Sequence, residues 1–183
     1  LVFNPATGGV RQISNFLPVG NPSNPYSAAT RVLYTFFDVG LRKDEITTDA
    51  GRAVVGAKGL LGAWDYEVGA GVAQSKTEQV NANRVNAVVL ENAIAAGTYN
   101  FLSPAAGTIR ANDLRINPAR NATSDLSFVD AKVSGELMPL PAGALAMAAG
   151  VEYRRESLKD RPDPLSTGGF VLGQGSTKTD GAR

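Results

Sequence analysis

The sequence predicts an all-β fold, namely an antiparallel meander of long hairpins that is part of a transmembrane β-barrel, with long loops and one short loop helix. The first observation is the alternation of apolar with polar or small residues over stretches of about ten residues, the length that a tilted strand needs to cross a bilayer. The second is that two hairpins with short turns are separated by a long polar connection. Outer-membrane barrels have this pattern, with short turns on one side and long loops on the other.

The clearest hairpin lies within residues 126–156, with strands predicted over about 126–138 and 144–157. Its turn is predicted at Pro139-Leu140-Pro141-Ala142-Gly143, because proline cannot donate to a strand ladder and glycine accepts strained angles. On each strand, every second residue is apolar or small: Val129, Ala131, Val133, Gly135 and Leu137, then Leu145, Met147, Ala149, Val151 and Tyr153.

A second hairpin has the same pattern, with strands over about 50–60 and 64–76 and a turn at Leu61-Gly62-Ala63. One face of its second strand carries Trp64, Tyr66, Val68, Ala70 and Val72, whereas its first strand alternates more weakly. Aromatic residues at both ends of an apolar band, here Trp64 and Tyr66 at one end and Tyr153 at the other, are typical of barrel girdles. Core aromatics of a soluble sandwich explain them equally well.

A further strand is predicted over about 30–42, which is rich in aromatic and β-branched residues. Its poor alternation indicates burial on both faces or projection beyond the membrane. Residues 1–29 are rich in Asn, Pro, Gly and Ser, and we interpret them as a surface loop or, equally, as a frayed end.

Two long loops complete the prediction, over residues 77–125 and 158–183. Within the first loop, residues 84–96 are predicted to form the short helix, because Val85, Val88 and Val89 share one face. Asn81 or Asn83 is the expected N-cap, and Gly97 is expected to end the helix.

The charged face of the last strand carries Glu152, Arg154 and Glu156. We interpret these residues as a cross-strand charge ladder with Lys132 and Glu136. The alternative is a polar lumen in which they contact a plug or a substrate.

Composition excludes several classes of function. The chain has 183 residues, a net charge of +1 and no basic stripe, so nucleic acid is not an expected partner. It has no cysteine and no histidine, which excludes disulfides, Cys/His zinc sites and a Ser-His-Asp triad within these residues. We therefore predict no catalytic, metal or cofactor-binding residue and no enzymatic activity. The sequence begins with Leu1 and shows no leader, so we expect a fragment or a processed form.

Residues 150–157, Gly-Val-Glu-Tyr-Arg-Arg-Glu-Ser, are followed at 160–163 by Asp-Arg-Pro-Asp. This stretch resembles the penultimate strand and loop of TonB-dependent outer-membrane receptors, in the subgroup often described as Oar-like. Further stretches are similar to that subgroup in the same order: Asn21-Pro22, Asn24-Pro25-Tyr26, Asp38-Val39-Gly40-Leu41-Arg42, Gly62-Ala63-Trp64-Asp65-Tyr66 and Gly97-Thr98-Tyr99-Asn100-Phe101.

The resemblance implies a plugged barrel, of the 22-stranded kind, in the bacterial outer membrane. It implies uptake of a scarce ligand, such as a siderophore, peptide or glycan, energised by a TonB-type partner protein through a plug domain. The sequence shows neither that plug nor a TonB-contact segment. Four residues of the longest loop, chosen for their polar or aromatic character, are the predicted ligand contacts: Tyr99, Asn100, Arg110 and Arg115.

Two alternatives remain open. A passive porin-like barrel would use the same strands, and its partners would again be outer-membrane lipid and a small solute. A soluble extracellular β-sandwich that acts as a binding module would instead pack the apolar faces against each other.

Overall fold

The computed structural model describes residues 1–175 and 177–183. Residue 176, inside the predicted loop 158–183, lies outside the described residues. Strands hold 55% of the residues and helices 12%, so the predicted all-β class is confirmed. Among the described helices, none is long and apolar enough to span a membrane.

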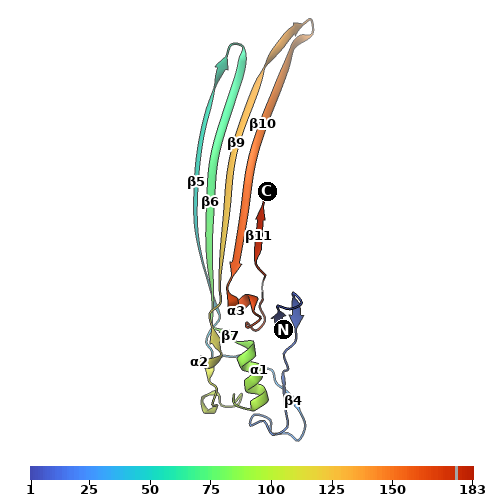
Figure 1. Ribbon diagram of the computed structural model, residues 1–183, viewed down its shortest axis with the longest axis vertical. Coiled ribbons are helices and arrows are strands. Elements are labelled where there is room, and N and C mark those ends of the chain that lie inside the picture. Colours follow the sequence, from blue (N-terminus) through green and yellow to red (C-terminus); the bar gives the residue numbers. More distant parts are fainter. Residues whose placement is uncertain (176) are drawn as a thin grey trace. The chain divides into compact units, whose positions relative to one another are not determined.

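One sheet contains the long strands β5 (Lys43–Leu61), β6 (Trp64–Ala82), β9 (Ala119–Leu140) and β10 (Gly143–Pro162). Together with β11 (Thr179–Ala182) they pair in the order β11-β10-β9-β6-β5 (Figure 1). Because neighbours in this sheet follow one another in the chain, the long hairpins form the predicted antiparallel meander. The sheet is not closed, and β5 and β11 are its edges.

Both predicted tight turns are present. Gly62 and Ala63 join β5 to β6, and Pro141 and Ala142 join β9 to β10. Gly62 has a φ of 67° and Gly143 a φ of 131°, backbone conformations that residues with a Cβ rarely adopt.

The long strands extend beyond the predicted boundaries. β6 continues to Ala82 and β9 begins at Ala119, so the connection between them spans residues 83–118 instead of the predicted 77–125. Likewise β10 continues to Pro162 and β11 occupies part of the predicted loop 158–183. The prediction ended each strand where apolar alternation stopped, but strand pairing continues through polar residues.

The chain forms two compact units. The loop unit comprises Leu1–Thr47, Glu78–Asn121 and Arg161–Lys178, and the sheet unit comprises Thr48–Thr77, Ala122–Asp160 and Thr179–Arg183. Every buried apolar side chain among the described residues belongs to the loop unit: Val2, Leu17, Val39, Val85, Ala87, Leu90, Ala93, Ile94, Tyr99, Phe101, Leu114, Pro118, Pro162 and Val171. The sheet unit has no such core within the described part of the chain.

Short elements build the loop unit. β1 pairs with β2, β3 with β4, and β7 with β8, all antiparallel. The elements are β1 (Val2–Asn4), β2 (Gly9–Arg11), β3 (Phe16–Leu17), β4 (Thr30–Arg31), β7 (Arg84–Val85), α1 (Ala87–Ala96), η1 (Pro104–Ala106), α2 (Ala111–Leu114), β8 (Arg115–Ile116) and α3 (Pro164–Thr167).

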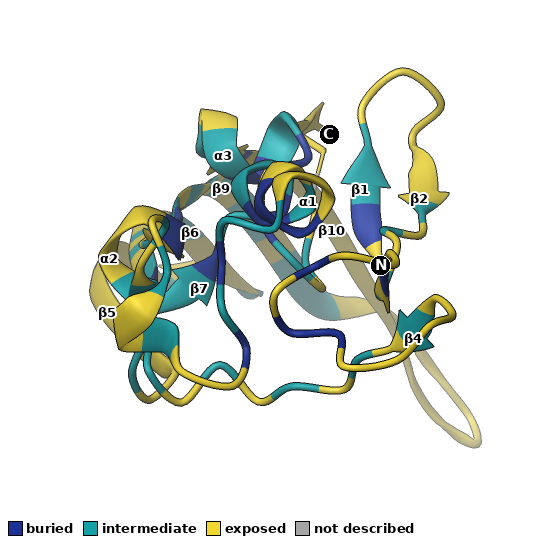
Figure 2. Cartoon of the chain, turned by 90° about the horizontal axis from the view of Figure 1, so that it is seen from below, coloured by how far each residue is buried: buried dark blue, intermediate teal, exposed yellow. Residues whose placement is uncertain are grey.

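The predicted loop helix is α1, which buries one face against the core of the loop unit (Figure 2). Gly97 ends it in the left-handed conformation, with a φ of 66°, as predicted. The N-cap is Asn86, not Asn81 or Asn83, because the Asn86 side chain accepts hydrogen bonds from the backbone N–H groups of Val88 and Val89.

The strand predicted over residues 30–42 is wrong for most of its length, because only Thr30–Arg31 are in a strand. Val32, Tyr34 and Phe36 pack against the core of the loop unit, while Leu33 and Phe37 are exposed. The side chains thus alternate as in a strand, but residues 32–42 pair with no strand among the described residues. A composition rich in aromatic and β-branched residues therefore indicates that a segment is extended and half-buried, but it does not show whether the segment pairs with another strand.

Residues 1–29 are not simply a surface loop. Asn21, Ser23 and Asn24 are buried, and their side chains replace regular backbone pairing. Asn21 Nδ2 donates to the carbonyl oxygen of Ile94 (3.0 Å), and Asn24 Nδ2 donates to that of Ala28 (2.9 Å). Asn21 therefore holds this stretch against the end of α1, and Asn24 holds the turn within the stretch itself.

Candidate membrane-facing surface

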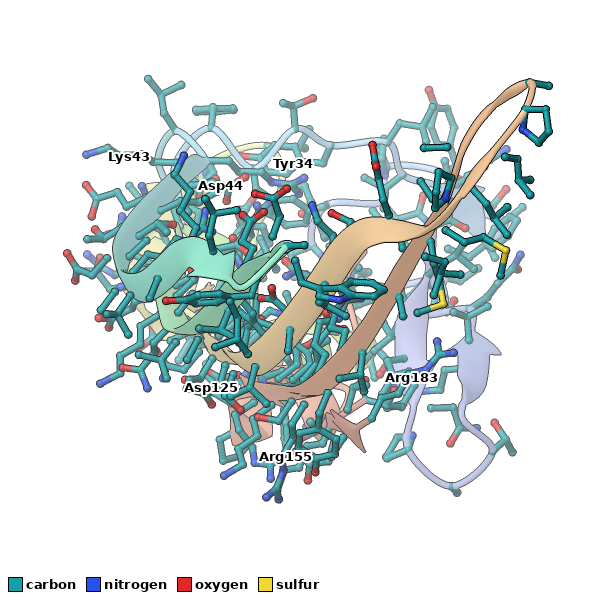
Figure 3. All side chains as sticks on the ribbon, turned by 90° about the horizontal axis from the view of Figure 1, so that it is seen from above. Tyr34, Lys43, Asp44, Asp125, Arg155 and Arg183 are labelled. Carbon is teal, nitrogen blue, oxygen red and sulfur yellow. The ribbon has the colours of Figure 1, made fainter. Side chains whose placement is uncertain are left out.

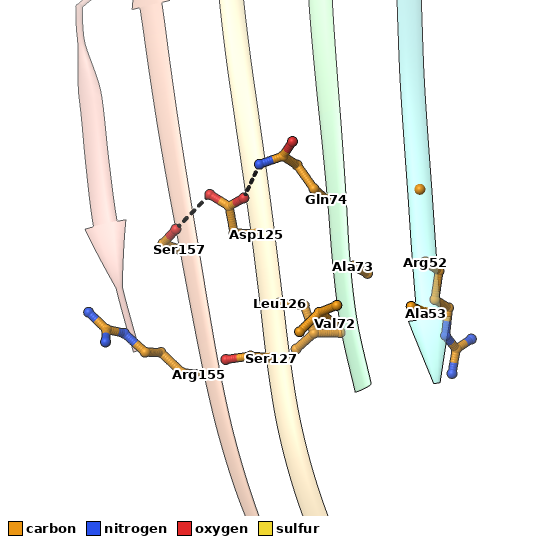
Figure 4. Close-up of a pocket in the computed structure, with 11 residues that line it drawn as sticks. Arg52, Ala53, Val72, Ala73, Gln74, Asp125, Leu126, Ser127, Arg155 and Ser157 are labelled. Carbon is orange, nitrogen blue, oxygen red and sulfur yellow. Dashed lines mark hydrogen bonds between the residues drawn. The ribbon is translucent and has the colours of Figure 1, made fainter. Parts of the chain in front are cut away.

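Contacts between strands establish which side chains share a face of the sheet unit. Gln74 Nε2 on β6 donates to Asp125 Oδ1 on β9 (2.7 Å), and Ser157 Oγ on β10 donates to Asp125 Oδ2 (3.2 Å; Figure 4). Since side chains alternate along a strand, every second residue from these three lies on their face, which we call the apolar face. Lys132 and Glu67, whose charged groups lie 3.3 Å apart, are on the opposite face, which we call the polar face.

Contacts with β6 show which residues of β5 lie on each face of the sheet. The hydroxyls of Thr48 and Thr77 lie 3.1 Å apart, which puts both on the polar face. A Cβ on Gly59 would lie 3.0 Å from the ring of Tyr66, so Gly59 shares the apolar face with Tyr66. Ala53, Val55 and Ala57 follow from the alternation.

The apolar face carries no charged residue over a band of equal length on three strands. The band comprises Trp64, Tyr66, Val68, Ala70 and Val72 on β6, Val129, Ala131, Val133, Gly135 and Leu137 on β9, and Leu145, Met147, Ala149, Val151 and Tyr153 on β10. At a rise of about 3.3 Å per residue, eight residue steps span about 26 Å along each strand. At a tilt of about 40° this gives a band about 20 Å tall, close to the roughly 25 Å of membrane barrels.

The band is open to its surroundings. Val72 is 58% exposed, Val151 70% and Tyr153 68%. Soluble monomers rarely expose contiguous apolar surface of this extent, so the band indicates contact with an apolar environment or partner.

Aromatic rings pack over glycines of neighbouring strands. A Cβ on Gly135 would lie 2.7 Å from Cε3 of Trp64, on the apolar face. On the polar face, a Cβ on Gly71 would lie 2.4 Å from Cε1 of Phe128. The absence of a side chain at these glycines lets each ring lie flat across the neighbouring strand, which stabilises its register.

A polar cluster marks the end of the apolar band nearest Tyr153. Asp125 accepts from both Gln74 and Ser157, so one carboxylate joins three strands. This cluster borders an open hollow of about 730 Å³ that Arg155 also lines. The side chain of Arg155 points away from the ribbon (Figure 3), as expected for a charge at the edge of an apolar band.

The polar face carries mainly charged and small residues, with a few apolar ones such as Val54 and Phe128, and its ion pairs differ from the predicted ladder. Lys132 pairs with Glu67 on β6, and Arg154 pairs with Glu156 on its own strand (3.2 Å). The prediction assigned Lys132 to the neighbouring β10, because the sequence does not show that β6 lies on its other side. Both pairs are well exposed, so they contribute little to stability.

The four predicted ligand contacts all lie in the loop unit. Tyr99 is fully buried, and its hydroxyl donates to Asp38 Oδ2 (2.6 Å). Asn100 Oδ1 accepts from the backbone N–H groups of Leu102 and Ser103, both at 2.9 Å. The contact of these residues with a ligand stays a prediction, but the side chains of Tyr99 and Asn100 already hold the loop in shape.

The two predicted arginines flank α2. Arg115 Nε donates to the carbonyl oxygen of Val39 (2.7 Å), and this bond holds the bend that precedes β5. Arg110 is exposed, and its backbone N–H donates to Asp113 Oδ2 (2.8 Å). Of the four predicted residues, Arg110 and Arg115 are the exposed ones.

Asp38 is the residue that sequence reasoning missed. It accepts hydrogen bonds from the hydroxyls of both Tyr34 (3.1 Å) and Tyr99. Burial, with the hydrogen bond to Asp38, raises the pKa of Tyr99 well above the usual tyrosine value, and burial also raises the pKa of Tyr34. No local pattern in the sequence points to this cluster, since Asp38 and Tyr99 are far apart in the chain.

The chain matches no known protein-family model, and no curated protein matches it. The geometry of the two faces and the motif resemblance therefore carry the functional assignment.

Proposed function

We propose that this chain is part of the wall and the outer loops of a TonB-dependent outer-membrane receptor, a plugged barrel that imports a scarce ligand. The observation that carries the proposal is the distribution of buried apolar side chains. All of them, among the described residues, lie in the loop unit, whereas the apolar side chains on the apolar face of the sheet unit are half-buried or exposed. A bilayer supplies the apolar surroundings that such a face requires.

The connectivity supports an orientation. Both tight turns lie at one end of the long strands, and residues 83–118 connect the other ends. Barrels of this class keep short turns in the periplasm and long loops outside. In the proposed receptor, the loop unit is therefore extracellular and available to a ligand.

The motif resemblance supports the receptor class over other barrels. In that class, uptake of a siderophore, peptide or glycan depends on a TonB-type protein that acts through the plug. The exposed polar face then lines the lumen and meets the plug, and the apolar face meets lipid.

Site-directed spin labelling tests the two faces. These residues contain no cysteine, so a single cysteine introduced into the intact protein reports one position once any cysteine outside them has been replaced by serine. We expect labels at Val68, Val133 and Val151 to collide with oxygen, which concentrates in lipid, and labels at Glu67, Lys132 and Glu152 to collide with a water-soluble nickel chelate. Valine positions shielded from both reagents would instead support the soluble sandwich.

Energy coupling tests the receptor class. Cells that express the intact protein are given a panel of labelled siderophores, vitamins, peptides and glycans, with and without a protonophore. We expect uptake of at least one compound to stop when the proton-motive force is removed. Uptake that persists unchanged would favour the passive porin-like barrel.

A further inference from the structure

The loop unit contains a hollow of about 350 Å³, which none of the four predicted ligand contacts lines. Its wall is mainly apolar and comes from α1 and from residues far from α1 in sequence: Val32, Tyr34, Phe36, Leu90, Ile94 and Phe101. Its volume lies at the lower end of the range of small-molecule sites, which are about 300–1,000 Å³ and mostly apolar with a few placed polar groups.

The aromatic wall of this hollow is fixed in position. The ring of Tyr34 meets those of Phe36 and Phe101 edge-on, with centroids 5.1 and 5.4 Å apart. The Tyr34 hydroxyl donates a hydrogen bond to Asp38, which does not line the hollow. Tyr34 therefore presents its ring carbons to the hollow. Edge-to-face arrangements of this kind hold the rings rigidly, and a flat apolar group can pack against the wall that they form.

One charge stands at the hollow. Among the described residues that line it, Arg31 on β4 is the only one with a charged side chain, and Gln12 and Asn15 add polar groups. Arg31 is exposed, so its guanidinium is available to a ligand. A guanidinium binds a carboxylate through two parallel hydrogen bonds.

We propose that this hollow binds a small aromatic carboxylate, with its ring among Tyr34, Phe36 and Phe101 and its carboxylate on Arg31. The ring fits the apolar walls, and the negative charge complements the single cation. This inference names a ligand class for the proposed receptor, and it therefore rests on the proposed function.

Equilibrium binding tests the proposal with a matched pair of probes. Naphthalene-2-carboxylate and the neutral naphthalene-2-carboxamide are titrated into the intact protein in lipid nanodiscs, and binding to empty nanodiscs is subtracted. We expect the carboxylate to bind about fivefold more tightly than the amide, the upper range for a solvent-exposed charge pair. Equal affinities, or no saturable binding, would overturn the proposal.

Variants locate the site. Arg31→Gln should remove the preference for the carboxylate, whereas Arg42→Gln, which changes an exposed arginine of the same unit outside the hollow, should keep it. Ser14→Trp should weaken both probes by filling the hollow, and Ser14→Ala should not. A preference that survives Arg31→Gln would refute the assignment even if Ser14→Trp does not fold.

Failure of this inference is distinguishable from failure of the proposed function. Energised uptake of another ligand, together with absent naphthoate binding, would refute only the ligand class. Tight and Arg31-dependent binding without energised uptake would refute only the receptor mechanism.

Discussion

Replacement of Val133 by arginine tests the membrane assignment directly. Val133 is the middle residue of the apolar band on β9, which runs from Val129 to Leu137. If this face meets lipid, Val133 lies near the bilayer midplane, where arginine costs about 2–4 kcal/mol of folding free energy. On an exposed surface in water the same change should stay within about 0.5 kcal/mol.

The magnitude should depend on depth and on face. Ser127 lies six residues from Val133 on the same face, about 20 Å along the strand and about 15 Å along the membrane normal at a tilt of about 40°. This exceeds half of a band about 25 Å tall, so Ser127→Arg should cost only about 0–1 kcal/mol. Ser134→Arg, beside Val133 but on the polar face, should cost similarly little.

Reversible unfolding of the intact protein in lipid vesicles, followed through a denaturant titration, measures all three changes. The expected order is a large loss for Val133→Arg and small losses for the two serine variants. If Val133→Arg costs no more than Ser127→Arg, the apolar face does not meet lipid. If Ser134→Arg costs as much as Val133→Arg, the two faces have been misassigned.

Two substitutions test the packing, and a rise in pH tests the buried tyrosines. Gly71→Ala places a Cβ 2.4 Å from Phe128 and should cost about 1–3 kcal/mol in the same unfolding assay. As a control, Gly51→Ala meets nothing within 4 Å and should cost less. A second change, Phe128→Ala, should reduce the free-energy cost of Gly71→Ala. Asp38→Ala leaves the buried Tyr99 hydroxyl without its acceptor and should cost about 1–3 kcal/mol, a loss that should shrink in a Tyr99→Phe background. Because the folded pKa values of Tyr34 and Tyr99 are raised, the native state keeps protons that the unfolded state loses above about pH 10, so stability should fall as pH rises beyond that value. Tyrosinate absorbance should show a late-titrating component that Tyr99→Phe diminishes, and Tyr99→Phe should also reduce the slope of stability against pH.

The hairpins could be predicted from sequence because their signals are local. The alternation on β6, β9 and β10 assigns faces without knowledge of the partner strand, and cross-strand contacts such as Gln74 with Asp125 agree with those faces. Glycine and proline at the turns act within a few residues. Gly97 ends α1 for the same local reason.

The loop unit could not be predicted because its contacts are not local. Residues 32–39 read as a strand, but their side chains pack on a core that includes Leu90 and Phe101. Arg11 on β2 forms a paired salt bridge with Glu91 on α1, at 2.7 and 2.8 Å, across 80 residues of sequence. No periodicity in the sequence around Arg11 or around Glu91 indicates that these two residues meet.

The candidate site likewise has a part that local patterns predict and a part that depends on contacts between distant residues. Alternation alone predicted the apolar face, since it requires only the period of a strand. Tyr99 was chosen for its aromatic character, yet the structure uses it as a core residue whose hydroxyl is held by Asp38. The hollow beside Arg31 joins β4 to α1, and sequence reasoning considered neither stretch as a site.

The sheet unit lacks two things that a soluble domain supplies internally. Its apolar face has no covering layer among the described residues, and its edge strand β5 leaves one side of a 19-residue strand unpaired. Soluble proteins protect such edges with short strands, prolines or inward charges, and residues 53–57 of β5, Ala-Val-Val-Gly-Ala, contain none of these. A bilayer covers the face but not the edge, because unpaired backbone groups are costly in hydrocarbon. Additional strands beside β5 would pair its edge but would not cover the apolar face. A closed barrel in a membrane satisfies both requirements at once, and for this reason the face and the edge together favour the barrel over a sandwich.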